Sequence, residues 1–190
     1  MGANNGTKVA ALCGAVYWAP RGTALPTDAS TALPETFRRL GAVTDDGVKP
    51  SRDTKTDQVK EWDGSTLVNL LTDESRGYEF TLVSVFDQDV LEFVNGRENV
   101  SLTPATSSTG TKITVKDVGG KPEQGVLIFD MRFGKKKVRK VIPTADPVID
   151  SEEAYKLDGL TGFGVNVAAL KDAAGVYIYT YAEDNDVVVA

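Results

Sequence analysis

The feature that most constrains the fold is a set of short segments in which apolar and polar side chains alternate. In residues 77–86, the side chains of Tyr78, Phe80, Leu82 and Phe86 fall on one side of an extended chain. Because successive side chains of a strand point to opposite faces of a sheet, this spacing predicts a strand. The opposite side is also partly apolar, so we expect both faces to be covered, by another sheet or by another subunit.

Other segments repeat this alternation and are separated by glycine, proline and aspartate turns. Strands are predicted at residues 11–18, 111–118, 125–133, 136–142, 160–170 and 175–182. One helix is predicted directly after Asp87, because Val90, Leu91 and Val94 recur at helical spacing and Gly96 follows them. A single helical turn is expected over residues 35–41. The sequence therefore predicts a mainly β fold, a β-sandwich or barrel with one short α-helix and long arms.

The 190 residues are expected to form a single domain with several extensions. Small polar residues predict an N-terminal arm at 1–12, and spacer prolines predict an extended arm at 19–34. A long loop or hairpin is expected at 45–72. The acidic residues 183–190 are expected to form a C-terminal tail, since their spacing does not fit a calcium loop.

The composition excludes several classes of function. The chain has no histidine and one cysteine, so catalysis that depends on a histidine base and disulfide-dependent folding are both excluded. A net charge of −6 disfavours general binding to nucleic acid. No catalytic constellation, metal site or cofactor motif is recognised, and no membrane insertion is expected. We therefore predict a protein that is not an enzyme.

The stretch from residue 49 to 63 is unusually charged and is predicted to be exposed. Only Val59 and Trp62 are available to anchor this stretch to a core. We expect its charged residues, and two acidic residues just before it, to contact other copies of the chain. The predicted contact residues are Asp45, Asp46, Arg52, Lys55, Asp57, Lys60 and Trp62.

A second charged stretch places five positive charges within six positions. These residues are Lys135, Lys136, Lys137, Arg139 and Lys140. They are predicted to face solvent, a lumen or a partner, because unpaired burial of a charge is costly. Docking on acidic residues of a neighbouring copy is favoured over binding to DNA. Such docking would weaken as the salt concentration rises. The alternative is a solvated hairpin with no partner.

Several segments, taken in order, resemble the major tail-tube proteins of siphoviruses, especially those of phages that infect actinobacteria. The segments are residues 14–23 with Leu25-Pro26, residues 40–48 with the charged stretch ending at Trp62-Asp63-Gly64, residues 78–96, and residues 175–181. The resemblance extends over most of the chain from residue 14 to 182.

The resemblance implies hexameric rings whose inner sheets join into one barrel, with a long loop and terminal arms that bridge neighbouring rings. The stacked rings would enclose a tape-measure protein and later conduct DNA, with tail-tip and tail-terminator proteins at the ends. It also implies assembly in the cytoplasm of the host bacterium and a place in the virion tail. The alternatives are a capsid decoration or tail-terminator protein, and a small ligand-binding β-barrel or a histidine-free hydrolase.

Overall fold

The computed structural model describes residues 13–83, 86–150 and 162–184, and in these residues the chain is mainly β, as predicted. The strands are β1 (Cys13–Pro20), β2 (Arg38–Arg39), β3 (Lys49–Lys60), β4 (Thr66–Leu82), β5 (Val100–Thr103), β6 (Lys112–Val115), β7 (Gly125–Phe133), β8 (Lys136–Ile149), β9 (Phe163–Leu170) and β10 (Tyr179–Asp184). The helices are α1 (Gln88–Asn95) and the short 3-10 helix η1 (Arg97–Asn99).

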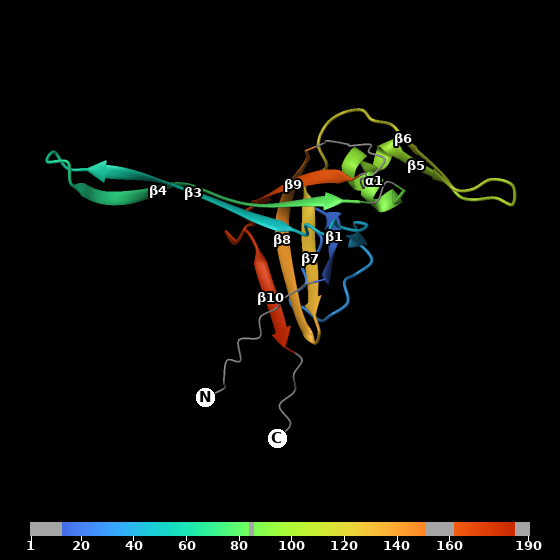
Figure 1. Ribbon diagram of the computed structural model, residues 1–190, viewed down its shortest axis with the longest axis horizontal. Helices are drawn as coiled ribbons and strands as arrows, with labels where there is room; N and C mark the ends of the chain where they lie inside the picture. Colours follow the sequence, from blue (N-terminus) through green and yellow to red (C-terminus); the bar gives the residue numbers. More distant parts are fainter. Residues whose placement is uncertain (1–12, 84–85, 151–161, 185–190) are drawn as a thin grey trace, which may run out of the picture.

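Two layers of antiparallel strands share the long strand β8 (Figure 1). The first layer runs β2, β1, β7, β8 and β10, and the second runs β8, β9, β4 and β3. The first half of β8 pairs with β7 and β10, whereas its second half, from Thr144 onward, pairs with β9. Pro143 lies at this change of partner, where the absence of a backbone N–H is tolerated.

The core lies between the two layers, as the alternating pattern predicted. Tyr78, Phe80 and Leu82 of β4 are buried there, with Val16 of β1 and Phe129 of β7. The Tyr78 and Phe129 rings lie 4.8 Å apart between centroids, a spacing typical of favourable aromatic pairs. The side chains that share one face of β4 therefore bind the layers together.

The predicted end of this strand was wrong, because β4 ends at Leu82. Phe86 lies beyond the strand and is 90% exposed, so it does not continue the buried face. Ser84 and Val85 lie outside the described residues.

The predicted helix is confirmed as α1, and its ends follow the sequence signals. The Asp87 side chain accepts a hydrogen bond from the Asp89 backbone N–H at 3.0 Å, and Gly96 ends the helix with φ of 86°. Arg38 of β2 pairs with Asp89 at 3.1 Å and also with Glu92. These ion pairs hold α1 across one end of the sandwich (Figure 1).

The helical turn predicted over residues 35–41 is wrong. This segment forms a turn, in which the Phe37 N–H donates to the Pro34 carbonyl at 2.9 Å, followed by β2. Phe37 packs on the outer face of the first layer, whereas Leu40 enters the core between the layers. One turn of helix cannot send these two side chains to two different clusters, and an extended chain can.

The residues after β1 lack regular secondary structure, but they lie against the body and do not reach out as an arm. Ala29 is buried, and Leu25 and Leu33 pack on the outer face of the first layer beside Val141 of β8. The predicted N-terminal arm and residues 185–190 of the predicted tail lie outside the described residues, while Glu183 and Asp184 belong to β10.

Candidate functional site: assembly surfaces

A two-stranded ribbon leaves the body and forms its most prominent projection (Figure 1). We call residues 52–75 the arm: from Arg76 inward β4 pairs with both β3 and β9, whereas in the arm β3 and β4 pair only with each other. Every side chain of β3 is exposed. An isolated two-stranded hairpin is at best marginally stable in water, so the arm lacks the packing that stabilises the rest of the fold.

The part of the arm nearest the body carries ion pairs between its own strands. Arg52 lies 3.4 Å from Glu74, and Lys55 lies 3.5 Å from Asp73. Arg76 donates to Glu74, and this hydrogen bond, with added charge from Arg52, lowers the pKa of the Glu74 carboxyl. These charged side chains are thus engaged within the chain, although exposed pairs of this kind contribute little stability.

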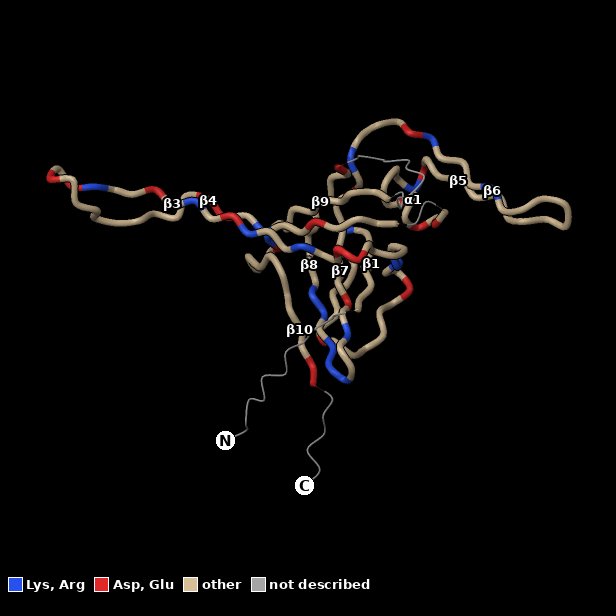
Figure 2. The backbone as a smooth tube through the Cα atoms, viewed as in Figure 1, with Lys and Arg blue, Asp and Glu red and all other residues tan. Residues whose placement is uncertain are grey.

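The predicted contact residues do not all belong to the arm. Asp45 and Asp46 lie in the turn before β3, and Asp46 is 3.5 Å from Lys49 at the base. Asp57 and Lys60 lie exposed on β3. The structure therefore spreads the predicted residues along the ribbon and does not gather them into one patch (Figure 2).

The end of the arm is a tight turn with an exposed tryptophan. Gly64 has φ of 89°, and Asp63 accepts a hydrogen bond from the Ser65 N–H at 2.8 Å. Trp62 is 105% exposed and Val59 is 38% exposed. The two side chains that could have anchored the segment to the core do not do so, and the segment is exposed as the sequence predicted.

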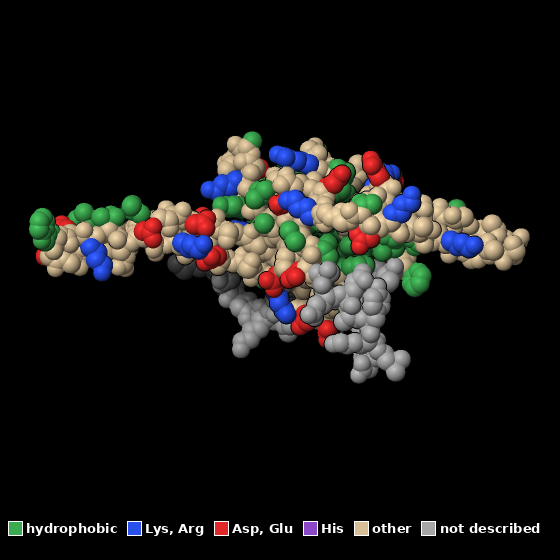
Figure 3. Space-filling view, turned by 90° about the horizontal axis from the view of Figure 1, so that it is seen from above, with side chains coloured by type: hydrophobic (Ala, Val, Ile, Leu, Met, Phe, Trp, Pro, Cys, Tyr) green, Lys and Arg blue, Asp and Glu red, His purple; other side chains and the backbone are tan. Residues whose placement is uncertain are grey.

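Sequence reasoning missed the main surface feature of the arm, which is its apolar outer part. We call this part, residues 56–71, the tip. Figure 3 shows hydrophobic side chains along one edge of the projecting ribbon. The exposed large hydrophobic residues of the tip are Val59, Trp62, Leu67, Val68, Leu70 and Leu71. The run from 67 to 71 was the available signal, since four apolar residues among five are unusual in an exposed loop.

The basic stretch forms the β7–β8 turn and the start of β8, but one of its charges is internal. Arg139 is only 3% exposed. Its guanidinium donates to the Thr31 carbonyl at 2.9 Å, the Asp28 carbonyl at 3.1 Å and the Asp130 carboxylate at 3.2 Å. The prediction that Arg139 contacts a neighbouring copy is therefore corrected, because the segment after β1 supplies the partners that make burial possible.

Two further cations of this stretch have partners within the chain. Lys136 lies 3.2 Å from Asp184 of β10, and the Lys140 ammonium lies 5.7 Å from the centroid of the Tyr78 ring. Lys137 lies opposite Glu183 across the β8–β10 pair. Figure 2 shows the basic turn at the lower end of the body beside the acidic end of β10. Most of the positive charges of this stretch therefore have partners within the chain.

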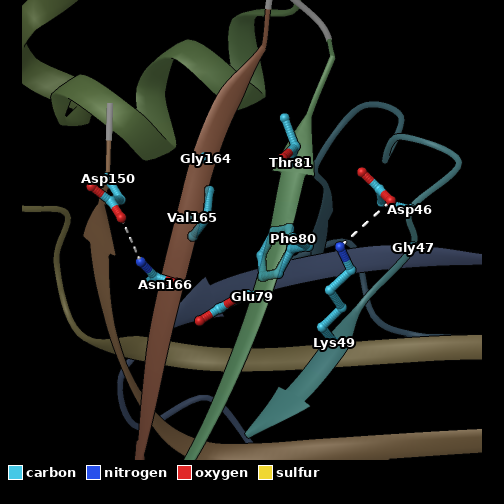
Figure 4. A pocket seen from close by; sticks show the side chains of 10 residues that line it. All are labelled: Asp46, Gly47, Lys49, Glu79, Phe80, Thr81, Asp150, Gly164, Val165 and Asn166. Atoms are coloured by element: carbon cyan, nitrogen blue, oxygen red, sulfur yellow. Dashed lines mark hydrogen bonds and ion pairs between the residues drawn. The ribbon is translucent and has the colours of Figure 1, made fainter. Parts of the chain in front are cut away.

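A polar hollow of about 240 Å³ opens on the outer side of β4 and β9 (Figure 4). Four of its polar side chains form two pairs, since Asp46 pairs with Lys49 and Asn166 donates to Asp150 at 3.1 Å. No serine, cysteine or histidine lines it. Among the described residues, no group of acidic or cysteine side chains could hold a metal ion, and no helix is long and apolar enough to cross a membrane.

The described residues form a mainly β protein whose prominent features are an unsupported ribbon and an apolar tip. The sequence profile of the family "Phage tail tube protein" matches residues 1–190, so the chain belongs to this family of virion tail proteins. The resemblance seen in the sequence is thereby confirmed at the level of the family, while its assignment to actinobacteriophages stays a prediction. A comparison with curated proteins found no match.

Proposed function

We propose that this tail tube subunit builds stacked hexameric rings that enclose a tape-measure protein and later conduct DNA to the host. Tail-tip and tail-terminator proteins bind the ends of the tube, which assembles in the cytoplasm of the host bacterium. The role is structural and not enzymatic. Family membership supports a tube subunit over a capsid decoration protein, a tail terminator, a ligand-binding barrel or a hydrolase.

The observation that carries the proposal is the arm. Twelve consecutive exposed residues of β3 form an edge strand, and among the described strands only β4 pairs with it. A long exposed edge with apolar side chains beside it promotes association with another chain. A monomer gains nothing from such a ribbon, whereas a stacked assembly gains a contact in every subunit.

The ends of the layers support ring formation. Among the described strands, β10 pairs only with β8, and β3 pairs only with β4, so each layer ends in an edge strand. Joining edges between neighbouring copies removes unpaired backbone groups and closes the sheets into a barrel. The net charge of −6 favours free passage of DNA through such a barrel, because few phosphate contacts would hold it back.

Electron microscopy of the purified chain tests this proposal. After prolonged incubation at high concentration, we expect tubes of constant diameter, and class averages viewed down the axis should show six-fold symmetry. Light scattering on the same samples should rise with tube length. A chain that remains monomeric at every concentration, or rings with another symmetry, would contradict the proposed hexameric tube.

A further inference from the structure

The exposed hydrophobic residues of the body suggest where the tip binds. Outside the arm, four of the described large hydrophobic side chains are exposed around the end of the molecule that holds α1, β5 and β6. These residues are Phe86, Leu102, Val115 and Val118. Val148 and Leu170 are the other two exposed hydrophobics, and they lie on β8 and β9. The apolar surface is thus concentrated at the tip and around the β5–β6 hairpin.

The β5–β6 hairpin has one apolar face that extends from the core into solvent. Val100 pairs with Val115 and Leu102 pairs with Ile113, so these four side chains share a face. Val100 is buried and Ile113 packs on the core, whereas Leu102 is 39% and Val115 is 36% exposed. Each pair therefore has one side chain against the core and one that is partly exposed, so the core fixes the position of an apolar face that it covers only in part.

The two apolar surfaces lie on opposite sides of the body. Figure 1 shows the arm leaving on one side and the β5–β6 hairpin on the other, so the tip cannot reach the hairpin of its own chain. Each copy thus carries one surface of each kind at opposite ends of its long axis. A contact between two different surfaces is head-to-tail, and it either closes a ring or propagates along a filament.

The chemistry of the contact follows from what remains unpaired. The charges at the base of the arm are paired within the ribbon, and those of the basic stretch are largely paired within the body. In the tip, Asp57 and Lys60 are exposed, but exposed large hydrophobic side chains outnumber them. We propose that the tip of one copy docks on the apolar face of the β5–β6 hairpin of a second copy. This inference rests on the proposed function and names the partner surface of the arm, a surface that binds through hydrophobic contact.

Paired substitutions on the two strands of the tip test the chemistry of the contact. Val68→Glu with Leu70→Glu places two charges on the face of the ribbon that also carries Val59, and should raise the concentration needed for tube formation about 100-fold, since two apolar contacts are lost. Thr56→Glu with Gln58→Glu is the matched control, because these residues pair with Leu71 and Asn69 and therefore lie on the opposite face of the ribbon. The control should form tubes at nearly the wild-type concentration, and equal impairment by both pairs would overturn the inference.

A mixing experiment tests the acceptor surface. Val115→Glu should impair tube formation as the tip variant does, with circular dichroism showing that both variants are folded. A tagged tip variant keeps its own hairpin intact, so it should capture more of the untagged Val115→Glu chain than either variant captures of itself. Absence of capture in the mixture, or tubes from the tip variant at the wild-type concentration, overturns the inference and leaves the proposed function standing. A wild-type chain that never assembles overturns the proposed function itself.

Discussion

The arm and the β7–β8 hairpin look alike in the sequence, since both are stretches dense in charge, yet the structure uses their charges differently. In the hairpin, a guanidinium is buried and Lys136 pairs with β10, so the charges fix elements of the body to one another. In the arm, the charges pair across an exposed ribbon and leave an apolar tip beyond them.

The difference shows that a run of charge does not by itself mark a docking surface. What matters is whether the fold supplies partners, and the β7–β8 hairpin is surrounded by them. Arg139 meets the segment after β1 on one side and Asp130 on the neighbouring strand. Beyond its base, where the Tyr177 hydroxyl donates to the Glu74 carbonyl, the arm pairs with no other described strand, and its apolar side chains are exposed.

The largest effect on stability is expected from removing the buried guanidinium of Arg139. Arg139→Met should lower the free energy of unfolding by about 3 kcal/mol, because it leaves the Asp130 carboxylate and two carbonyls without their donor. Chemical denaturation of the monomer measures the change. Lys137→Met, two positions earlier on the same strand, is the matched control and should change stability by about 0.5 kcal/mol at most. Equal losses in the two variants would remove the distinction between buried and exposed charges in this hairpin.

The next largest difference between the arm and the β7–β8 hairpin is expected in the rates of amide hydrogen exchange. Amides of the arm should exchange rapidly in the monomer, because no core supports the ribbon, and should become protected in the tube. Amides of β7 and the first half of β8 should be protected equally in both states, since their partners lie within the chain. The prediction fails if the arm is as protected in the monomer as in the tube.

The alternating pattern was sufficient to predict the β class, the buried face of β4 and the β7 strand at residues 125–133. The cap at Asp87 and the glycine at position 96 were sufficient to place α1. These features depend on local spacing. The burial of Arg139 could not be foreseen, because its partners Asp28 and Thr31 are more than 100 residues away in the sequence. The apolar tip was missed because hydrophobic runs usually indicate buried strands.

Added salt should have a smaller effect on assembly than the substitutions above. It should leave tube formation unchanged or strengthen it, whereas the sequence predicted that salt weakens it. Electrostatic docking through the basic stretch would weaken between about 0.1 and 1 M NaCl, because the screening length falls from about 10 to 3 Å. A contact made by the tip should persist or strengthen, since it depends on apolar burial. Sedimentation of tubes across this range measures the difference, and a steep loss of tubes with salt would restore the basic stretch as the docking surface.

Charge reversal at the same stretch gives an independent measurement. Lys136→Glu with Lys137→Glu places like charges beside Asp184 and Glu183 of β10, so a modest local destabilisation is expected. Tube growth should nevertheless change by about twofold at most, because the tip is untouched. If this variant folds but fails to assemble, these lysines contact a neighbouring copy as the sequence first suggested.

The smallest expected effect is a pH dependence confined to the body. The Glu183 carboxylate accepts hydrogen bonds from the Ser30 hydroxyl and the Ala29 N–H, and these bonds lower its pKa below the ordinary value of 4.5. Because the folded pKa is depressed, the anchoring of the segment after β1 is fully present above pH 4.5 and is lost as pH falls through the folded pKa. The amide resonance of Ala29 in the monomer should therefore titrate with a midpoint below 4.5. Glu183→Gln should abolish this titration and Asp184→Asn should preserve it, whereas a midpoint at or above 4.5 would show that the carboxylate does not hold this segment.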